Sequence, residues 1–337
     1  MEKPLDYIIR KLLFSLIALI AVLIFNFVLF RVLPGDPVEM VINPRLRAEE
    51  RERIREDFGL DKPVWINTES FSEKASLPRL LDSQFFVYLS NLFRGNLGIS
   101  FHQKRPVMEL IKNRMGPTVL LIITGEVAGI VIGSLLGLIT AWKKKSFLDT
   151  AALILGMTAW SLPAFWLGIL LLFVSRGVLP MGGFITPGRT FETKYLMVLD
   201  MGRHLVLPAT TLALMLFGAY MLVIRNSTLE VLTEDYILTA KAKGLSPIRV
   251  LWDHALKNVS LPLITMVALD LGYALGGTIQ IETIFSWPGI GRLMFDALGQ
   301  RDYPVLQGVF LILAIGVIGA NFLADITYAV LDPRVKA

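Results

Sequence analysis

Residues 234–262 read EDYILTAKAKGLSPIRVLWDHALKNVSLP, and this polar stretch determines how the rest of the chain is interpreted. It separates two apolar segments, at about 205–224 and 261–284, and each is long enough to cross a membrane as a helix. Its first part, Glu234–Ala242, predicts a short helix. Gly244 predicts where that helix ends, because glycine readily adopts the left-handed conformation of a helix C-terminus.

A second helix is predicted to begin directly after this turn. Ser246 suits the capping position before a helix, and Pro247 suits the first helical position. The helix would carry Ile248, Leu251 and Trp252 on one face, at i, i+3 and i+4. Physical chemistry leaves two interpretations open: an amphipathic helix that lies on lipid headgroups, or a rigid surface that docks another protein.

The composition places the chain among membrane proteins. Of its 337 residues, 54% are hydrophobic and only 18% are charged, and the mean hydropathy is +0.60. A soluble domain carries about 25% charged residues and has no room to bury this much apolar surface. Since the apolar residues fall in long separate runs, we predict an all-α polytopic membrane protein.

Six apolar runs have the length of a transmembrane helix, at about 12–30, 115–142, 150–174, 205–224, 261–284 and 305–330. We expect Pro163 to kink the third of them. Residues 34–115 carry charges of both signs and no further spanning run, which predicts a small extramembrane domain between the first two helices. The chain is therefore predicted to have three parts. Residues 1–33 form the N-terminal end and the first helix, residues 34–115 form the extramembrane domain, and residues 116–337 form a core whose polar loop covers 229–260.

Basic residues predict the orientation of these helices. They precede the first run at Arg10 and Lys11, follow the second at 143–145, recur in the 234–262 stretch and return beyond the last run, at Arg334 and Lys336. With six spans, all four basic segments lie on one side, and short basic segments stay in the cytoplasm. Both termini are therefore predicted to be cytoplasmic, and residues 34–115 are predicted to lie outside. A loop of that length crosses the membrane regardless of its charge.

Small and polar residues inside the runs indicate where helices meet. Glycine occupies every fourth position over 125–137, which predicts close packing against another helix. Glu126 lies beside this stripe, where it would face a polar pathway or reach the interface. Asp270 lies near the middle of a run, where a carboxylate is costly, so we expect it to face the pathway or a partner. Asn321 and Asp325, four residues apart, are expected to hold helices together near the cytoplasmic end.

The segment Phe285–Ile290 combines a Ser-Trp-Pro-Gly turn signal with an aromatic residue at the expected outer interface. Two interpretations are open. Trp287 would anchor the chain in the aromatic belt of the membrane, or the turn would belong to an outer gate or a receptor contact.

No motif for catalysis, metal binding or nucleotide binding is present. The chain lacks H-E-x-x-H, G-x-S-x-G, G-x-G-x-x-G and the phosphate-binding loop G-x-x-x-x-G-K-[ST]. It has no cysteine, and its three histidines are scattered, so neither a thiol nucleophile nor a metal site is expected. The formal charge of +5 fits the orientation of the basic loops, and we do not interpret it as nucleic-acid binding.

An ordered set of short motifs runs along the whole chain: PGDP at 34–37, FGLDKP at 58–63, GNLGIS at 95–100, DYILTAKAKGL at 235–245, HALKN at 254–258, ETIFSWPGIG at 282–291 and RDYP at 301–304. Together they make the chain resemble the integral-membrane permease subunit of a binding-protein-dependent ABC importer, in the branch for dipeptides, oligopeptides and nickel. The general signature of such importers begins Glu-Ala-Ala six residues before its glycine. This chain has Leu238-Thr239-Ala240 there, in a form typical of the peptide branch.

The resemblance implies the type I ABC importer permease fold, in a multi-pass protein of the cytoplasmic (inner) membrane. It implies a second homologous permease chain that shares the pathway, two cytoplasmic ABC ATPases beneath, and an extracytoplasmic solute-binding protein. This chain would be a non-catalytic subunit that binds no cofactor, because ATP and Mg²⁺ would bind the partner ATPases. Di- and oligopeptides are the expected cargo.

The resemblance also assigns candidate residues. Those expected to couple to an ATPase are Asp235, Thr239, Ala240, Ala242, Gly244, Leu245, Ile248, Leu251, Trp252, His254, Leu256, Lys257 and Asn258. Those expected on the pathway or its gate are Glu126, Asp270, Glu282, Phe285 and Trp287. Asp270 is the candidate for recognising a peptide's amino group. Residues 64–83 form an insertion relative to shorter relatives.

Other functions compete with this interpretation. The same machinery would also carry oligosaccharides, nickel or another solute, because the binding protein selects much of the cargo. A self-sufficient channel or ion-coupled carrier would predict inverted repeats and several charges inside the membrane. An intramembrane enzyme would need nucleophile or metal motifs that the sequence lacks.

Overall fold

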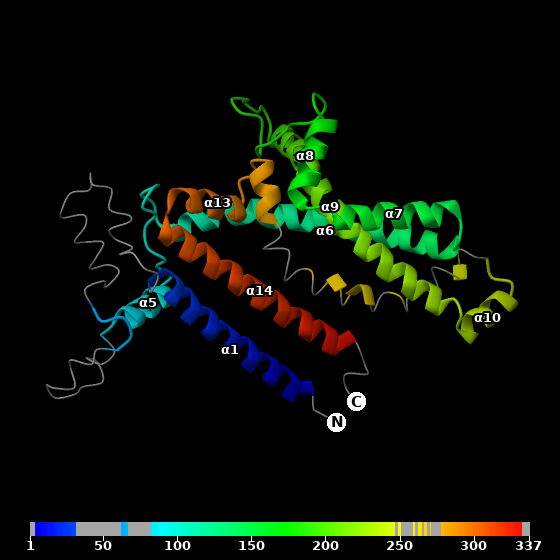
Figure 1. Ribbon diagram of the computed structural model, residues 1–337, viewed down its shortest axis with the longest axis horizontal. Coiled ribbons are helices and arrows are strands. Elements are labelled where there is room, and N and C mark those ends of the chain that lie inside the picture. The colour runs from blue at the N-terminus through cyan, green and yellow to red at the C-terminus, as the bar shows by residue number, and fades with distance from the viewer. Residues whose placement is uncertain are drawn as a thin grey trace. The chain divides into compact units, whose positions relative to one another are not determined.

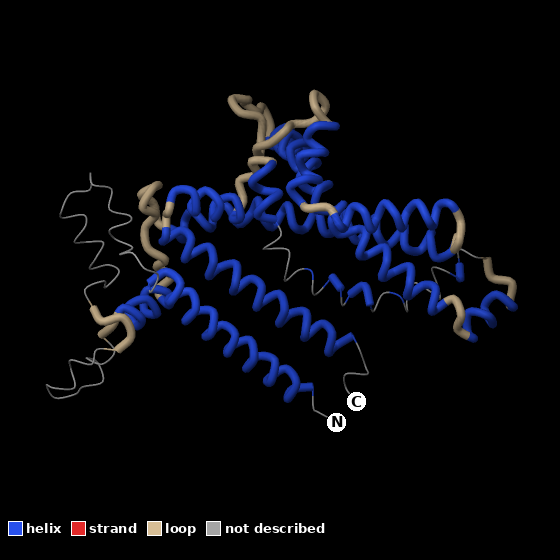
Figure 2. The backbone as a smooth tube through the Cα atoms, viewed as in Figure 1, coloured by secondary structure: helices blue, strands red, loops and turns tan. Residues whose placement is uncertain are grey.

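The computed structural model describes residues 4–31, 62–66, 82–246, 249–250, 259, 262–264, 266–267, 270 and 278–331. This part of the chain is helical, and Figure 2 shows helices joined by loops, with no strand among the described residues. The helices labelled in Figure 1 are α1 (Pro4–Arg31), α5 (Gln84–Phe93), α6 (Val107–Trp142), α7 (Phe147–Ser161), α8 (Ala164–Val174), α9 (Lys194–Val231), α10 (Asp235–Ala242), α13 (Ile290–Gln300) and α14 (Tyr303–Leu331).

Long apolar helices confirm the predicted polytopic membrane protein. Among the described residues, α1, α6, α9 and α14 are each long and apolar enough to cross a membrane. The pair α7 and α8 makes a fifth candidate if both belong to one span. The predicted span at 261–284 is described only in part, at 262–264, 266–267, 270 and 278–284.

Proline breaks the third predicted span more sharply than a kink. Helix α7 ends at Ser161, and α8 begins at Ala164 with its axis bent by 113° from that of α7. Pro163 has no N–H to continue the helical hydrogen bonds, and it disfavours the helical conformation of the residue before it. Leu162 is accordingly extended, with ψ of 136°, and Pro163 is the N-cap residue of α8.

The glycine stripe of α6 packs against α9, as its spacing predicts. A Cβ atom on Gly133 would lie 2.6 Å from the carbonyl oxygen of Phe217, and one on Gly137 would lie 2.8 Å from that of Met221. Helix α7 also contacts α9, where Gly156 and Gly218 meet so closely that an added Cβ atom on Gly218 would overlap the backbone of Gly156. Small residues therefore allow backbone-to-backbone approach at both helix pairs.

The chain divides into two compact units. Unit 1 comprises Met1–Ser15, Gly116–Arg292 and Gly316–Ala337, and unit 2 comprises Leu16–Met115 and Leu293–Ile315. Unit 2 thus takes in one end each of α1 and α14 besides the predicted extramembrane segment. The domain boundaries predicted at residues 33 and 115 stay a prediction.

In unit 1, ion pairs tie helices together. Lys11 Nζ lies 2.8 Å from Asp325 Oδ1, which confirms that Asp325 joins two helices. Arg225 donates to both carboxylate oxygens of Asp149, at 2.7 and 3.0 Å, and so links α9 to the first turn of α7. Two parallel bonds from one guanidinium fix geometry as well as charge.

Candidate functional site

The polar loop after α9 begins with the predicted short helix. Helix α10 covers Asp235–Ala242, and Gly244 follows with φ of +77°, in the left-handed region that favours glycine. The N–H of Leu245 donates to the carbonyl oxygen of Ala240 at 3.3 Å, a bond typical of a Schellman helix end. The helix and its glycine terminus are therefore confirmed.

One face of α10 packs onto its own chain. Ile237, Ala240 and Val250 form a buried apolar cluster, and Leu245 and Leu232 pack against it. The N–H of Val250 donates to the carbonyl oxygen of Ser246 at 3.0 Å, and most of the second predicted helix lies outside the described residues. The cluster therefore holds α10 against Val250.

The other face of α10 is exposed. It carries the predicted coupling residues Asp235, Thr239 and Ala242, and Gly244 is exposed beyond it. Ala240 is only 5% exposed, and Leu245 is half-buried, so these two support the loop from within. The remaining coupling candidates lie outside the described residues: Ile248, Leu251, Trp252, His254, Leu256, Lys257 and Asn258. The coupling role of all thirteen stays a prediction.

Glu282 is a buried carboxylate with both oxygens hydrogen-bonded. Its Oε1 accepts from Thr118 Oγ1 at 2.7 Å, and its Oε2 accepts from the backbone N–H of Arg292 at 3.0 Å. Thr118 Oγ1 in turn accepts from the N–H of Ile290 at 2.8 Å. The carboxylate thus satisfies N–H groups in the first turn of α13, where a negative charge is favourable. A Cβ atom on Gly289 would overlap this carboxyl group, so glycine is required there.

The turn that follows Glu282 is held from several sides. Trp287 is fully buried, and its indole N–H donates to the carbonyl oxygen of Pro117 at 2.9 Å. Phe285 is also fully buried, and its carbonyl oxygen accepts from the N–H of Gly183 at 2.8 Å. The interpretation of Trp287 as a belt anchor is therefore wrong, because its side chain lies in the core of unit 1 with no exposed surface. These contacts position Glu282, Phe285 and Trp287 as one rigid turn.

A second buried carboxylate lies between α6 and α9. Glu126 is only 3% exposed, and its Oε1 accepts a hydrogen bond from the hydroxyl of Tyr220, which is fully buried. Asp270 also lies near this hydroxyl. Glu126 Oε2 and Asp270 Oδ2 are buried without a hydrogen-bond partner among the described residues. Glu126 therefore faces other helices inside unit 1, and the interpretation that it reaches the interface is wrong.

Sequence reasoning missed two of the side chains that complete these sites. Thr118 lies 164 residues from Glu282, and Tyr220 lies 94 residues from Glu126. For Tyr220 a signal was present, because a phenol within an apolar run needs a hydrogen-bond partner when it is buried. Among the described residues, no group of three or more histidine, cysteine, aspartate or glutamate side chains is placed to hold a metal ion.

Two family models together match most of the chain. Residues 133–337 match the family model described as binding-protein-dependent transport system inner membrane component, and residues 4–122 match the corresponding N-terminal model. A protein named putative peptide permease from Brucella suis is 38% identical over 338 residues, which cover 98% of this chain and 99% of the relative.

Two further relatives align over similar lengths. The oligopeptide transport system permease protein of Bacillus subtilis is 34% identical over 334 residues, and the glutathione transport system permease protein of Escherichia coli K12 is 33% identical over 332 residues. Each alignment covers 98% of this chain and 99% of the relative.

Proposed function

Because this chain belongs to the family of binding-protein-dependent transport system inner membrane components, we propose that it forms the pathway of an ATP-driven importer for di- and oligopeptides. The observation that carries the cargo assignment is end-to-end similarity to relatives whose names specify peptide, oligopeptide and glutathione transport. Those three names share peptide chemistry, which favours peptides over oligosaccharides or nickel.

We propose six transmembrane helices, with both termini and the α10 loop in the cytoplasm and residues 34–115 outside. The basic residues at 143–145 and at the chain ends support this orientation. Four or five candidate spans lie among the described residues, so a further span at 261–284 is compatible with a total of six. A topology reporter fused after Lys145 should be cytoplasmic, and an external reporter would overturn the arrangement.

We propose that the chain works with a second permease chain, two cytoplasmic ATPases and an external solute-binding protein. It would bind no cofactor itself, because ATP and Mg²⁺ would bind the ATPases. The exposed face of α10 supports docking of an ATPase, and the buried cluster beneath it supports transmission of movement, because a fixed element moves as one body. ATP binding would then favour one arrangement of the helices, and hydrolysis would release it.

For Asp270 we propose contact with the amino group of a peptide on the pathway. Its Oδ2 has no partner among the described residues, so it has an acceptor available. Asp270→Asn removes the negative charge and keeps the shape, and it should change the rate or the substrate range of uptake. Unchanged uptake and substrate range in that variant would refute the assignment.

The experiment that tests the proposed function is uptake of a labelled peptide into proteoliposomes. Vesicles with this chain, the second permease and both ATPases should take up peptide when the binding protein is outside and ATP is inside. Vesicles that lack the ATPases should not. Uptake by this chain alone would show a self-sufficient carrier instead.

A further inference from the structure

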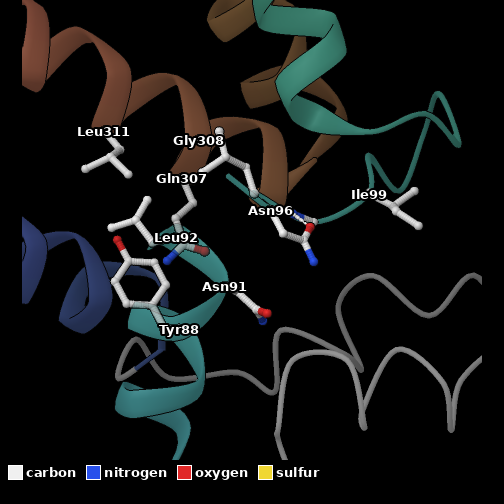
Figure 3. A pocket seen from close by; sticks show the side chains of 10 residues that line it. Tyr88, Asn91, Leu92, Asn96, Ile99, Gln307, Gly308 and Leu311 are labelled. Atoms are coloured by element: carbon white, nitrogen blue, oxygen red, sulfur yellow. Dashed lines mark hydrogen bonds between the residues drawn. The ribbon is translucent and has the colours of Figure 1, made fainter. Parts of the chain in front are cut away.

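Unit 2 contains a pocket of about 110 Å³, and its lining residues are not among the coupling, pathway or gate candidates. Its walls come from α5, from the 96–99 loop and from α14 (Figure 3). The polar groups that line it are the side chains of Tyr88, Asn91, Asn96 and Gln307, and no charged side chain among the described residues lines it. Figure 3 shows the Gln307 side chain extending from α14 toward α5.

A buried amide network beneath this pocket is incomplete. The Nδ2 of Asn26, which is fully buried, donates to the Tyr88 hydroxyl at 3.2 Å and to the backbone carbonyl oxygen of Gln307 at 3.3 Å. Gln307 Nε2 and Asn26 Oδ1 are buried and have no hydrogen-bond partner among the described residues. An N–H group in this position is costly unless an acceptor arrives. This N–H has almost no accessible surface, so the Gln307 amide has to turn toward the pocket before it can donate to the carbonyl oxygen of a ligand.

The loop that forms one wall is held in place before any ligand arrives. Asp302, at the start of α14, is 2% exposed and accepts from Ser100 Oγ at 2.5 Å and from the N–H of Phe101 at 3.1 Å. The side-chain oxygen of Asn96 accepts from the N–H of Gly98 at 3.0 Å within the same loop. A preformed wall lowers the entropy lost when a ligand binds.

The chemistry of the lining selects an uncharged ligand. A free peptide carries a charged amino group and a charged carboxylate, and a lipid headgroup carries a phosphate. None of these charges would meet an opposite charge among the described residues that line the pocket, and burying an unpaired charge is unfavourable. The volume is also well below the roughly 300–1,000 Å³ of pockets that enclose a whole ligand. One residue from the interior of a polypeptide fits both limits, because its peptide groups are neutral.

We infer that this pocket receives one uncharged residue from a loop of the solute-binding protein. The carbonyl oxygen of that residue would accept from Gln307, and its side chain would pack between Leu92, Ile99 and Leu311. The inference rests on the proposed function, which places the segment holding α5 outside the membrane, where the binding protein acts. A small, preformed pocket that takes one anchoring residue is a common centre of protein interfaces.

Cross-linking from the pocket tests this inference. The chain has no cysteine, so Ile99→Cys offers a single site in this subunit for a maleimide benzophenone, once the cysteines of the partner subunits are replaced. Ile99 is 51% exposed and lines the pocket, so the probe has access. With the assembled transporter in nanodiscs and the binding protein added, illumination should join this chain to the binding protein. Phe147→Cys, at an exposed residue of α7, should give no such product.

Any other product would overturn the inference. Cross-links only to lipid, to the second permease or to a labelled peptide, or no cross-link at all, each contradict a binding-protein contact. ATP-dependent uptake by the unaltered transporter is measured in parallel. If uptake is present and the cross-link is absent, only this inference fails, whereas absent uptake counts against the proposed function.

Affinity measurements test the role of Gln307. Gln307→Leu removes the donor, and it should weaken the affinity of the transporter for the binding protein by about tenfold, the usual scale for losing one buried hydrogen bond. The matched control is Asn321→Leu, the same kind of amide-to-leucine change at an exposed residue of the same helix. Its affinity should stay within about twofold of the unaltered transporter, since it lies outside the pocket. Equal affinities for the two variants would contradict the inference.

Discussion

Unit 1 buries carboxylates in two contrasting ways. Glu282 has a hydrogen bond on each oxygen, from Thr118 and from the N–H of Arg292. Glu126 has a bond on one oxygen only, from Tyr220, and its other oxygen has no partner among the described residues. A buried carboxylate is costly inside a membrane unless its acceptors are used. The comparison therefore distinguishes a carboxylate that stabilises a fixed turn, Glu282, from one that has an acceptor oxygen available for a further donor, Glu126.

The difference follows from what surrounds each carboxylate. At Glu282 one donor is the backbone N–H of Arg292 at the start of α13, which cannot leave without breaking that helix, and the other is Thr118, which itself accepts from the N–H of Ile290. At Glu126 the donor is the single hydroxyl of Tyr220, which Asp270 also approaches. One hydroxyl has one hydrogen for two carboxyl groups, so this cluster can accept a further donor from elsewhere.

Removing the saturated carboxylate should have the largest effect. Glu282→Ala removes the buried carboxylate that accepts from Thr118 and from the N–H of Arg292, and it should destabilise the chain by about 3 kcal/mol. The measurement is the melting temperature of the purified protein, with Glu192→Ala at an exposed site as control. A melting temperature equal to that of the control would show that the network does not fix the turn.

Removing the shared hydroxyl should have an intermediate effect. Tyr220→Phe keeps the ring that packs against α6 and deletes the only donor that Glu126 has among the described residues, so we expect a loss of about 1–2 kcal/mol. Tyr195→Phe, at an exposed position of α9, is the matched control for the same deletion. If Tyr220→Phe destabilised the protein more than Glu282→Ala, the assignment of the two sites would have to be reversed.

Exchanging each carboxylate for an amide gives the sharpest contrast, with the smallest effect expected at Glu126. Glu126→Gln supplies N–H donors to a cluster that lacks them, so stability should be unchanged or rise by up to about 1 kcal/mol. Glu282→Gln turns one acceptor into a donor that faces other donors, so stability should fall by roughly 1–2 kcal/mol. The measurement is thermal unfolding of the two variants under the same conditions. Stability changes of the same sign in both variants would contradict the distinction between the two carboxylates.

Local patterns in the sequence predicted much of the fold but few of its polar contacts. The glycine spacing of 125–137 and the helix end at Gly244 each depend on residues close together in the chain, and both are confirmed. Pro163 was predicted to kink its span, and the structure shows a sharper break into two helices there. The partners of Glu126 and Glu282 lie far away in the sequence, and hydrophobic periodicity carries no information about which distant side chain completes a polar site.

The polar loop shows the same limit on a smaller scale. Its exposed face on α10 was predictable, since Asp235, Thr239 and Ala242 follow helical spacing. That Ala240 and Leu245 would turn inward was not predicted, because their burial depends on contact with Val250 and Leu232. Motif membership gave the same coupling role to both sets of residues, and packing distinguishes them.

The measurement that tests the coupling role of this loop most directly is ATP-driven peptide uptake by the Gly244→Val variant. Valine is strained at a φ of +77°, so the turn should deform while the chain remains inserted in the membrane. Gly299→Val is the control, since an added side chain there meets open space at an ordinary φ. The proposed coupling role predicts that the Gly244→Val transporter loses uptake while the control retains it. Normal uptake by Gly244→Val would contradict coupling through this loop.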